Sequence, residues 1–188
     1  MKLGILGGSF NPIHLGHLLL AETAREELKL DRLVFIPVGL PPHKPARDLL
    51  PGLTRLKLVQ LAIRDQPAFV ASDIEVQRSG ISYTIDTIKL LRRQAADAEL
   101  FLLMGEDMLG VRWVEWSQIK RLCTIVVAHR AGRKPSRQER GLVWLPMPRI
   151  DISSSDIRKR AASGRSIRYL VPDAVGRYIR QHRLYTAT

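Results

Sequence analysis

Cysteine is nearly absent from this chain of 188 residues, which contains one, Cys123. A single cysteine excludes an internal disulfide and a cysteine metal cluster, and its place in the apolar run at 122–127 predicts a core residue. No apolar run approaches the ~20 residues of a membrane span. The first five residues are typical of a strand rather than a signal peptide. We therefore expect a cytoplasmic protein with no membrane partner.

Aromatic residues are also scarce, at 6% of the chain, whereas the formal net charge is +12. This basic balance favours anionic partners, which include nucleic acid, a membrane surface and small phosphorylated substrates. Proteins that read RNA interleave aromatic and basic side chains, so the low aromatic content argues against a nucleic-acid partner. Much of the excess charge lies at 130–140, which is typical of a solvated loop, and at 158–168, which includes a predicted helix.

Short apolar runs alternate with amphipathic segments along the chain. The apolar runs predict buried parallel strands at 2–7, 32–38, 69–71, 99–104 and 124–128. The amphipathic segments predict crossover helices at 15–30, 53–65 and 84–96.

This alternation predicts an α/β fold with a doubly wound parallel sheet and an active site at the carboxyl ends of the strands. The length and the 45% hydrophobic content fit one domain over 1–188. Residues 153–188 are expected to form its small C-terminal helical portion, which ends in a helix at 172–182 behind a proline in its first turn.

The loop that follows the first predicted strand has the features of a phosphate site. Gly7 and Gly8 let the main chain approach a ligand, and the N–H groups beside a helix start attract anions. His14 and His17 are three residues apart in the next helix, so their rings share one face. Bound phosphate should raise the pKa of both and favour the cationic, doubly donating form. Gly16 is expected to leave room for a base or ribose.

A tight turn with two surface histidines is the alternative for this loop, and the full combination of glycines and histidines disfavours it. A second anion site is indicated at 152–158, where three serines open a helix that ends at Gly164. Capping explains part of that pattern, with Ser153 or Ser154 as N-cap and Asp156 completing a capping box. The remaining hydroxyls and Arg158 also suit β and γ phosphates, and the two roles are compatible.

Two segments in the middle of the chain each allow two interpretations. Lys44 lies in a proline-rich surface loop, where it contacts an incoming phosphate or carboxylate or is an ordinary loop lysine. The helix start after 78–84 offers N–H groups to a substrate carboxylate, or it is capped by Ser82 or Thr84.

The predicted strand at 99–104 is followed by Gly105 and Asp107, and then by a predicted short helix that carries Trp113 and Trp116. An indole at the rim of a nucleotide site can stack on an aromatic base. Two tryptophans three residues apart are also typical of an amphipathic core stripe, so we expect at most one of them to contact a ligand.

Together these motifs resemble the bacterial nicotinate-nucleotide adenylyltransferases, in the nucleotidyltransferase superfamily that carries a His-x-Gly-His motif. The matching stretches are 8–17, 42–44, 82–87, 105–107, 152–158, 167–172 and 182–185. The stretches at 8–17 and 152–158 mark the superfamily. Those at 82–87 and at the tail select the nicotinate branch over related transferases that use phosphopantetheine or a cytidylyl donor. The resemblance implies a Rossmann-like nucleotidyltransferase fold.

The resemblance further implies adenylyl transfer from ATP to nicotinate mononucleotide, which gives deamido-NAD and pyrophosphate. It assigns catalytic roles to His14, His17 and Arg158. The residues implied for ATP are Gly7, Gly8, Ser9, Phe10, His14, Gly16, His17, Gly105, Asp107, Ser154, Ser155 and Arg158. The residues implied for nicotinate mononucleotide are Asn11, Lys44, Ser82, Tyr83, Thr84 and Trp113, with Trp116 as the alternative to Trp113.

The implied reaction needs no protein nucleophile, because the mononucleotide phosphate attacks the α-phosphorus of ATP directly. The sequence shows no carboxylate cluster that would form a metal cage, so Mg²⁺ is expected to arrive on the ATP phosphates. ATP and nicotinate mononucleotide are the expected partners, and the sequence leaves homo-oligomerisation open.

Overall fold

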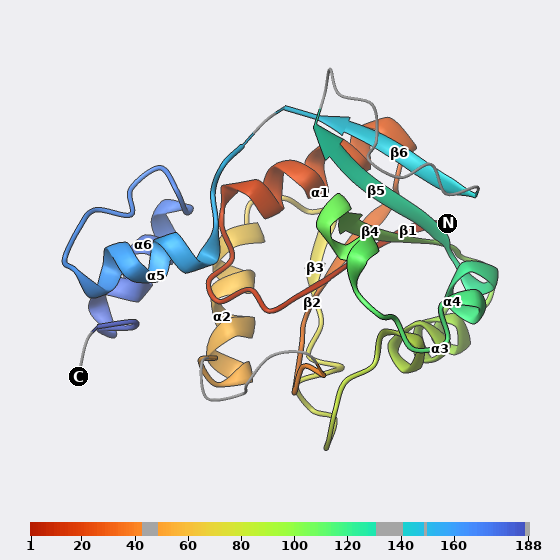
Figure 1. The fold of residues 1–188 in the computed structure, drawn as a ribbon, viewed down its shortest axis with the longest axis horizontal. Coiled ribbons are helices and arrows are strands. Elements are labelled where there is room, and N and C mark those ends of the chain that lie inside the picture. The colour runs from red at the N-terminus through yellow and green to blue at the C-terminus, as the bar shows by residue number, and fades with distance from the viewer. Residues whose placement is uncertain (43–48, 131–140, 149, 187–188) are drawn as a thin grey trace.

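A computed structural model describes residues 1–42, 49–130, 141–148 and 150–186 (Figure 1). Within these residues, six parallel strands form one sheet in the order β3-β2-β1-β4-β5-β6. The strands are β1 (Lys2–Gly8), β2 (Arg32–Pro37), β3 (Phe69–Ala71), β4 (Glu99–Gly105), β5 (Thr124–Arg130) and β6 (Leu142–Met147). The expected doubly wound α/β fold is confirmed, since the strand order reverses between β1 and β4.

The helices lie between and after the strands, close to the expected positions. They are α1 (Leu15–Leu28), α2 (Gly52–Ile63), α3 (Thr84–Gln94), α4 (Trp116–Leu122), α5 (Ser154–Ala162) and α6 (Asp173–Gln181), with a 3-10 helix, η2 (Glu106–Gly110), after β4. Pro172 is the N-cap residue of α6 rather than part of its first turn. None of the helices in the described residues is long and apolar enough to cross a membrane.

Two apolar cores lie on opposite faces of the sheet, because successive strand residues point to opposite sides. Leu6, Phe35 and Leu103 belong to one core, which they share with residues of α1, α2, α5 and α6. Ile5 and Val34 belong to the other, with residues of α3 and α4. Figure 1 shows α5 and α6 beside α2, away from α3 and α4. The C-terminal helices thus complete the core that supports the start of α1.

Cys123 lies in the second core, as expected from its apolar surroundings. Its thiol donates to the carbonyl of Ile119 at 3.3 Å, and burial raises its pKa to about 12. Strand β6 was not expected. It is an edge strand that contains Pro146, and a proline is tolerated at a sheet edge because no neighbouring strand needs its missing N–H.

The strand order reverses between β1 and β4, where open α/β sheets are expected to have a ligand-binding crevice. Pairing between β1 and β4 ends at Ile5 and Leu102, although the strands continue to Gly8 and Gly105. The carboxyl ends of these two central strands therefore separate, and ligands of open α/β sheets bind at such a point.

Candidate functional site

The loop after β1 presents its main chain to the crevice. Around Gly7, nothing lies within 4 Å of the position that a Cβ atom would take, so the backbone is open there. A Cβ atom on Gly8 would lie 3.2 Å from the Phe10 ring. Phe10 itself is 1% exposed and packs edge-on against His17, with ring centroids 5.0 Å apart. The ring of Phe10 therefore supports the loop from beneath, and the contact of this residue with ATP stays a prediction.

His14 and His17 lie face to face at the start of α1, as their spacing predicted. Their ring centroids are 3.8 Å apart with an angle of 31° between the ring planes. The N–H of His14 donates to Nδ1 of His17 at 3.2 Å. An imidazole whose Nδ1 accepts a hydrogen bond carries its proton on Nε2 when neutral. His17 therefore has an Nε2–H donor without needing a positive charge.

The pKa values of both histidines are lowered, which favours neutral rings over the expected cationic form. Burial lowers the pKa of His14 to about 4. Burial, and then the neighbouring His14, lower the pKa of His17 well below its usual value. Protonation of His17 at Nδ1 would also break its bond to the His14 N–H. The fold thus favours neutral imidazoles, and a bound phosphate has to overcome that bias before either ring becomes cationic.

This burial predicts a pH dependence of stability. The pKa of His14 is lower in the folded chain than in the unfolded chain, where it is ~6.5. The unfolded state therefore binds more protons between these values, and His14 should cost about 3 kcal/mol of stability at pH 4 relative to pH 7. The measurement is urea unfolding from pH 7 to pH 4 of the wild type and of His14→Asn. A variant that loses stability as steeply as the wild type would contradict the assignment to His14.

Gly16 lies against the ring of His14, and its contact with ATP stays a prediction. A Cβ atom on Gly16 would lie 3.1 Å from Nδ1 of His14. Nδ1 of His14 is buried and has no hydrogen-bond partner among the described residues. Gly16 therefore allows the His14 ring to fold back over the first turn of α1.

Helix α5 is docked onto the same loop by side chains that the sequence assigned to phosphate binding. Ser153 is the N-cap, since its Oγ accepts from the N–H of Asp156 at 3.1 Å and donates to that residue's carboxylate at 2.7 Å. The Ser154 hydroxyl donates to the carbonyl of Pro12 at 2.8 Å. The predicted cap at Ser153 is therefore confirmed, and Ser154 holds the loop.

Arg158 joins α5 to the loop as well. Its guanidinium donates to the carbonyl of Asn11 at 2.9 Å and reaches Oγ of Ser155 at 3.4 Å. Ser155 is exposed and Arg158 is partly exposed, so both keep polar groups for a ligand. The two predicted anion-binding segments are therefore adjacent in the fold.

Asn11 belongs to the same loop, and its side chain is buried. It is 1% exposed, and its Oδ1 accepts from the N–H of Leu50 at 3.3 Å and from the hydroxyl of Tyr185 at 2.9 Å. Its side chain thus ties the loop to two distant parts of the chain, and its contact with the mononucleotide stays a prediction.

The start of α3 borders the loop after β2. The N–H of Ser82 donates to the carbonyl of Leu40 at 2.9 Å. The predicted side-chain cap by Ser82 or Thr84 is wrong, because the N-cap residue is Tyr83 and no side chain caps the helix. The hydroxyl of Ser82 is buried with no hydrogen-bond partner among the described residues. The first N–H groups of α3 therefore keep the anion-binding capacity that the sequence suggested. Lys44 and the basic segment 131–140 lie outside the described residues.

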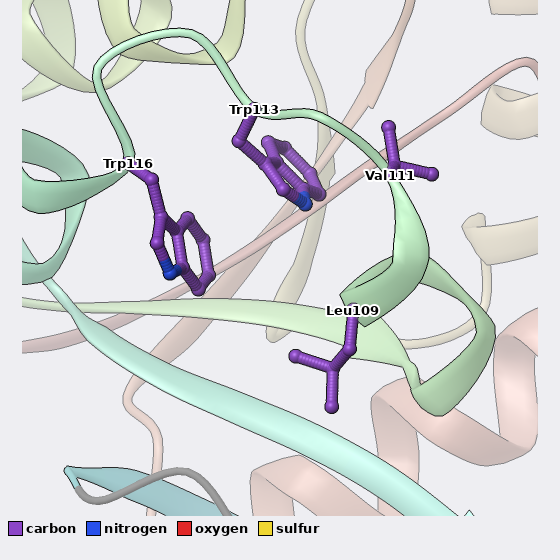
Figure 2. Close-up of a pocket in the computed structure, with 4 residues that line it drawn as sticks. All are labelled: Leu109, Val111, Trp113 and Trp116. Atoms are coloured by element: carbon purple, nitrogen blue, oxygen red, sulfur yellow. The ribbon is translucent and has the colours of Figure 1, made fainter. Parts of the chain in front are cut away.

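A cavity of about 260 Å³ lies beyond the end of β4, lined by Leu109, Val111, Trp113 and Trp116 (Figure 2). The two indole rings stack with centroids 5.6 Å apart. Nε1 of Trp113 donates to the carbonyl of Met108 at 2.9 Å, which fixes that ring. Trp113 precedes α4 and does not lie on the predicted helix, which begins at Trp116.

Asp107 is exposed on η2, between the end of β4 and this cavity. A Cβ atom on Gly105 would lie 2.5 Å from Oδ1 of Asp107, so only glycine allows the carboxylate to fold back on the strand end. Among the described residues, no cluster of three histidine, cysteine or acidic side chains could hold a metal ion.

The sequence reasoning missed Arg55, a fully buried cation next to the phosphate loop. Its signal was a charge on the apolar face of the predicted helix, in line with Val59 and Ala62. Tyr185 belongs to a matching stretch, but no role was assigned to it.

Known proteins resemble this chain in sequence and in fold. The model of the cytidylyltransferase-like family matches residues 5–160. A probable nicotinate-nucleotide adenylyltransferase of Thermomicrobium roseum is 46% identical, over 98% of this chain and 91% of the relative. Another, of Dehalococcoides mccartyi, is 43% identical over 98% and 97%. The solved structure of Plasmodium falciparum nicotinic acid mononucleotide adenylyltransferase complexed with NaAD has a TM-score of 0.82 at 18% identity, over 98% of this chain and 97% of that one.

Proposed function

The chain belongs to the nicotinate-nucleotide adenylyltransferases of the cytidylyltransferase-like family, and we propose that it transfers the adenylyl group of ATP to nicotinate mononucleotide. An oxygen of the mononucleotide 5′-phosphate attacks the α-phosphorus. The bond to the β-phosphate breaks, and deamido-NAD and pyrophosphate form. The attacking phosphate is already ionised near pH 7, so positioning and charge stabilisation account for the catalysis.

The contact between α5 and the loop after β1 is the observation that carries this proposal. Ser154 and Arg158 bind the carbonyls of Pro12 and Asn11, so both anion-binding segments border one crevice. In that arrangement the open backbone at Gly7 receives the phosphates from one side. Arg158 and Ser155 receive them from the other side.

The histidines act on the phosphates as fixed donors. We assign the Nε2–H group of His17 to the oxygen on which charge grows as the α-phosphorus is attacked, and His14 to the neighbouring phosphate. Their neutral form at pH 7 makes both available without a competing proton equilibrium. We assign Asp107 to the ATP ribose, at the end of β4 across the crevice.

ATP enters as its magnesium complex, in which Mg²⁺ neutralises phosphate charge. The residues available to that complex are Ser155, Arg158 and the backbone of the loop after β1. They are suited to phosphate oxygens rather than to the metal.

The acceptor occupies the side of the crevice that α3, η2 and the cavity border. The N–H groups at Thr84 and Ile85 are suited to the pyridine carboxylate, with Lys44 assigned to the mononucleotide phosphate. We assign the pyridine stack to Trp113, because its ring is fixed by Met108, whereas Lys120 lies 5.7 Å from the ring centre of Trp116.

The assignment of Trp113 can be tested by binding. We expect Trp113→Leu to weaken nicotinate mononucleotide binding about tenfold, the scale of one base–aromatic stack. The matched variant Trp116→Leu should change it by less than about threefold. Calorimetric titration of each variant measures this, and the reverse order of effects would move the assignment to Trp116.

The function itself is tested by pyrophosphate release from ATP with each candidate acceptor. Nicotinate mononucleotide should turn over fastest, ahead of nicotinamide mononucleotide, phosphopantetheine and choline phosphate. If the first is inert while another acceptor turns over, the specific function is wrong and the nucleotidyltransferase chemistry stands.

A further inference from the structure

Arg55 is buried in α2, between the loop after β1 and the connection from β2 to α2. Its side chain is 1% exposed, and each guanidinium nitrogen donates to a main-chain carbonyl. Nε binds Leu50 at 2.9 Å, and one terminal nitrogen binds Ser9 at 2.9 Å. The other binds Val38 at 2.6 Å and Gly39 at 3.3 Å.

These acceptors are unusual for a buried cation. No carboxylate of the described residues forms a salt bridge with Arg55. Glu75, the buried acid of this region, is bound to the Thr87 hydroxyl at 2.7 Å and attracts the charge of Arg55 without forming a salt bridge with it. Removing a cation from water is costly, and packed apolar side chains often stabilise a core equally well. Stability alone therefore gives a weak reason for an arginine here, whereas its planar fork can fix several carbonyls at once.

The carbonyls of Ser9, Val38 and Gly39 belong to two neighbouring loops at the carboxyl edge of the sheet, because β1 and β2 stay paired as far as Gly8 and Pro37. Ser9 follows the open glycines of the phosphate loop, while Val38 and Gly39 follow β2. A Cβ atom on Gly39 would lie 2.1 Å from the carbonyl oxygen of Glu75, so this backbone is closely packed on its other side. Arg55 thus joins the loop after β1 to the loop after β2 just beyond their last backbone hydrogen bond, in which the N–H of Val38 donates to the carbonyl of Gly8 at 2.9 Å.

A second route joins the same parts through Asn11. Leu50 accepts from Arg55 through its carbonyl and donates to Asn11 through its N–H. Tyr185, from the C-terminal tail, donates to the same Asn11 oxygen at 2.9 Å. The tail therefore closes a network that runs beneath the phosphate loop to Arg55.

We propose that Arg55 is a positioning residue for adenylyl transfer, which holds the loop after β1 and the start of the loop after β2 in the relative placement that in-line attack requires, with Tyr185 as the outer support of the same network. This inference rests on the proposed function. Arg55 touches neither substrate. It acts on the relative placement of two substrates that bind separately, and misplacement by ~1 Å can cost 10²-fold in rate.

Arg55→Lys tests this with the charge retained, because one ammonium cannot replace a fork that binds four carbonyls in two loops. We expect kcat to fall between ten- and a hundredfold, while the dissociation constants of ATP alone and of nicotinate mononucleotide alone change less than about threefold. Arg92→Lys is the matched control. Arg92 lies in the last turn of α3 and also binds main-chain carbonyls, those of Ala98 and Leu122, each at 2.6 Å. This variant should lower the melting temperature with kcat unchanged.

Tyr185→Phe keeps the test decisive if Arg55→Lys fails to fold, because it removes one hydroxyl. We expect kcat to fall three- to tenfold with separate substrate affinities retained, and Tyr178→Phe, a variant in α6, to leave kcat unchanged.

Wild-type kcat in folded Arg55→Lys would overturn the proposal, as would wild-type kcat in Tyr185→Phe if Arg55→Lys does not fold. If the wild type uses a different acceptor, the proposed function is wrong. The kcat of each variant relative to that of the wild type, measured with that acceptor, then still decides the role of Arg55. A wild type that uses no acceptor overturns both.

Discussion

His17→Ala should lower kcat at least about 10²-fold, the loss observed when one preorganised donor is removed from an active site. The expected loss follows from the hydrogen bond between the His14 N–H and Nδ1 of His17, which leaves the proton of the neutral ring on Nε2. The measurement is single-turnover adenylyl transfer with both substrates saturating, so that binding does not enter the rate. The melting temperature should fall only slightly, by the loss of one N-terminal capping contact.

Two further variants distinguish the role of His17 Nε2 as a donor from the role of its Nδ1 in capping the helix. The oxygen of His17→Asn can replace Nδ1 as acceptor, so this variant should melt like the wild type and be as slow as His17→Ala. The amide of His17→Gln places an N–H near the position of Nε2, so it should recover part of the rate at a lower melting temperature. Equal kcat in His17→Asn and His17→Gln would contradict the neutral-donor role.

The pH profile gives an independent check on that role. Burial lowers the pKa of His14 to about 4 and that of His17 well below its usual value. Histidine protonation should therefore not reduce kcat/KM as the pH falls from 8 to 6. A fall of kcat/KM as the pH rises through about 6.5, absent in His17→Gln, would show that the titrating group is His17 and that it works as a cation.

The sheet could be predicted from the sequence where burial alone determines strand character. β1, β2 and β4 are apolar on both faces because helices cover both sides of the sheet. Strands of this kind have nearly continuous apolar runs, which can be recognised in the sequence. β6 gave no such signal, since an edge strand has one neighbour and can contain Pro146. Tertiary pairing with β5, from Leu142 to Met147, makes it a strand.

The site was predictable as a set of backbone features, and less so as a set of side-chain contacts. Glycine placement and helix starts identified the loop after β1 and the start of α5, because those features depend on local chain geometry. The burial of Phe10 and Asn11 depends on how the loop packs on β2 and on the tail, which local sequence does not encode. Arg55 was missed for the same reason, since its partners are up to 46 residues away.

Arg158→Ala should reduce kcat/KM for ATP about 10²-fold, because it removes the charged donor that α5 places beside the loop after β1. Arg158→Lys should be intermediate, since an ammonium keeps the charge and loses the fork that binds the Asn11 carbonyl while reaching a phosphate. The matched control is Arg160→Ala on the same helix, whose guanidinium binds the Ser166 carbonyl at 2.8 Å.

The two functions of Arg158, holding the loop and binding the triphosphate, predict different ligand dependences. Loss of a phosphate contact should weaken ATP binding and leave AMP binding unchanged, because AMP lacks the β and γ phosphates. Loss of loop docking should weaken both nucleotides equally, because both use the backbone at Gly7. Calorimetric titration of ATP and AMP into Arg158→Ala distinguishes these outcomes, and we expect the larger loss for ATP. If Arg160→Ala loses as much, the effect comes from the net charge of α5 and the assignment of Arg158 is wrong.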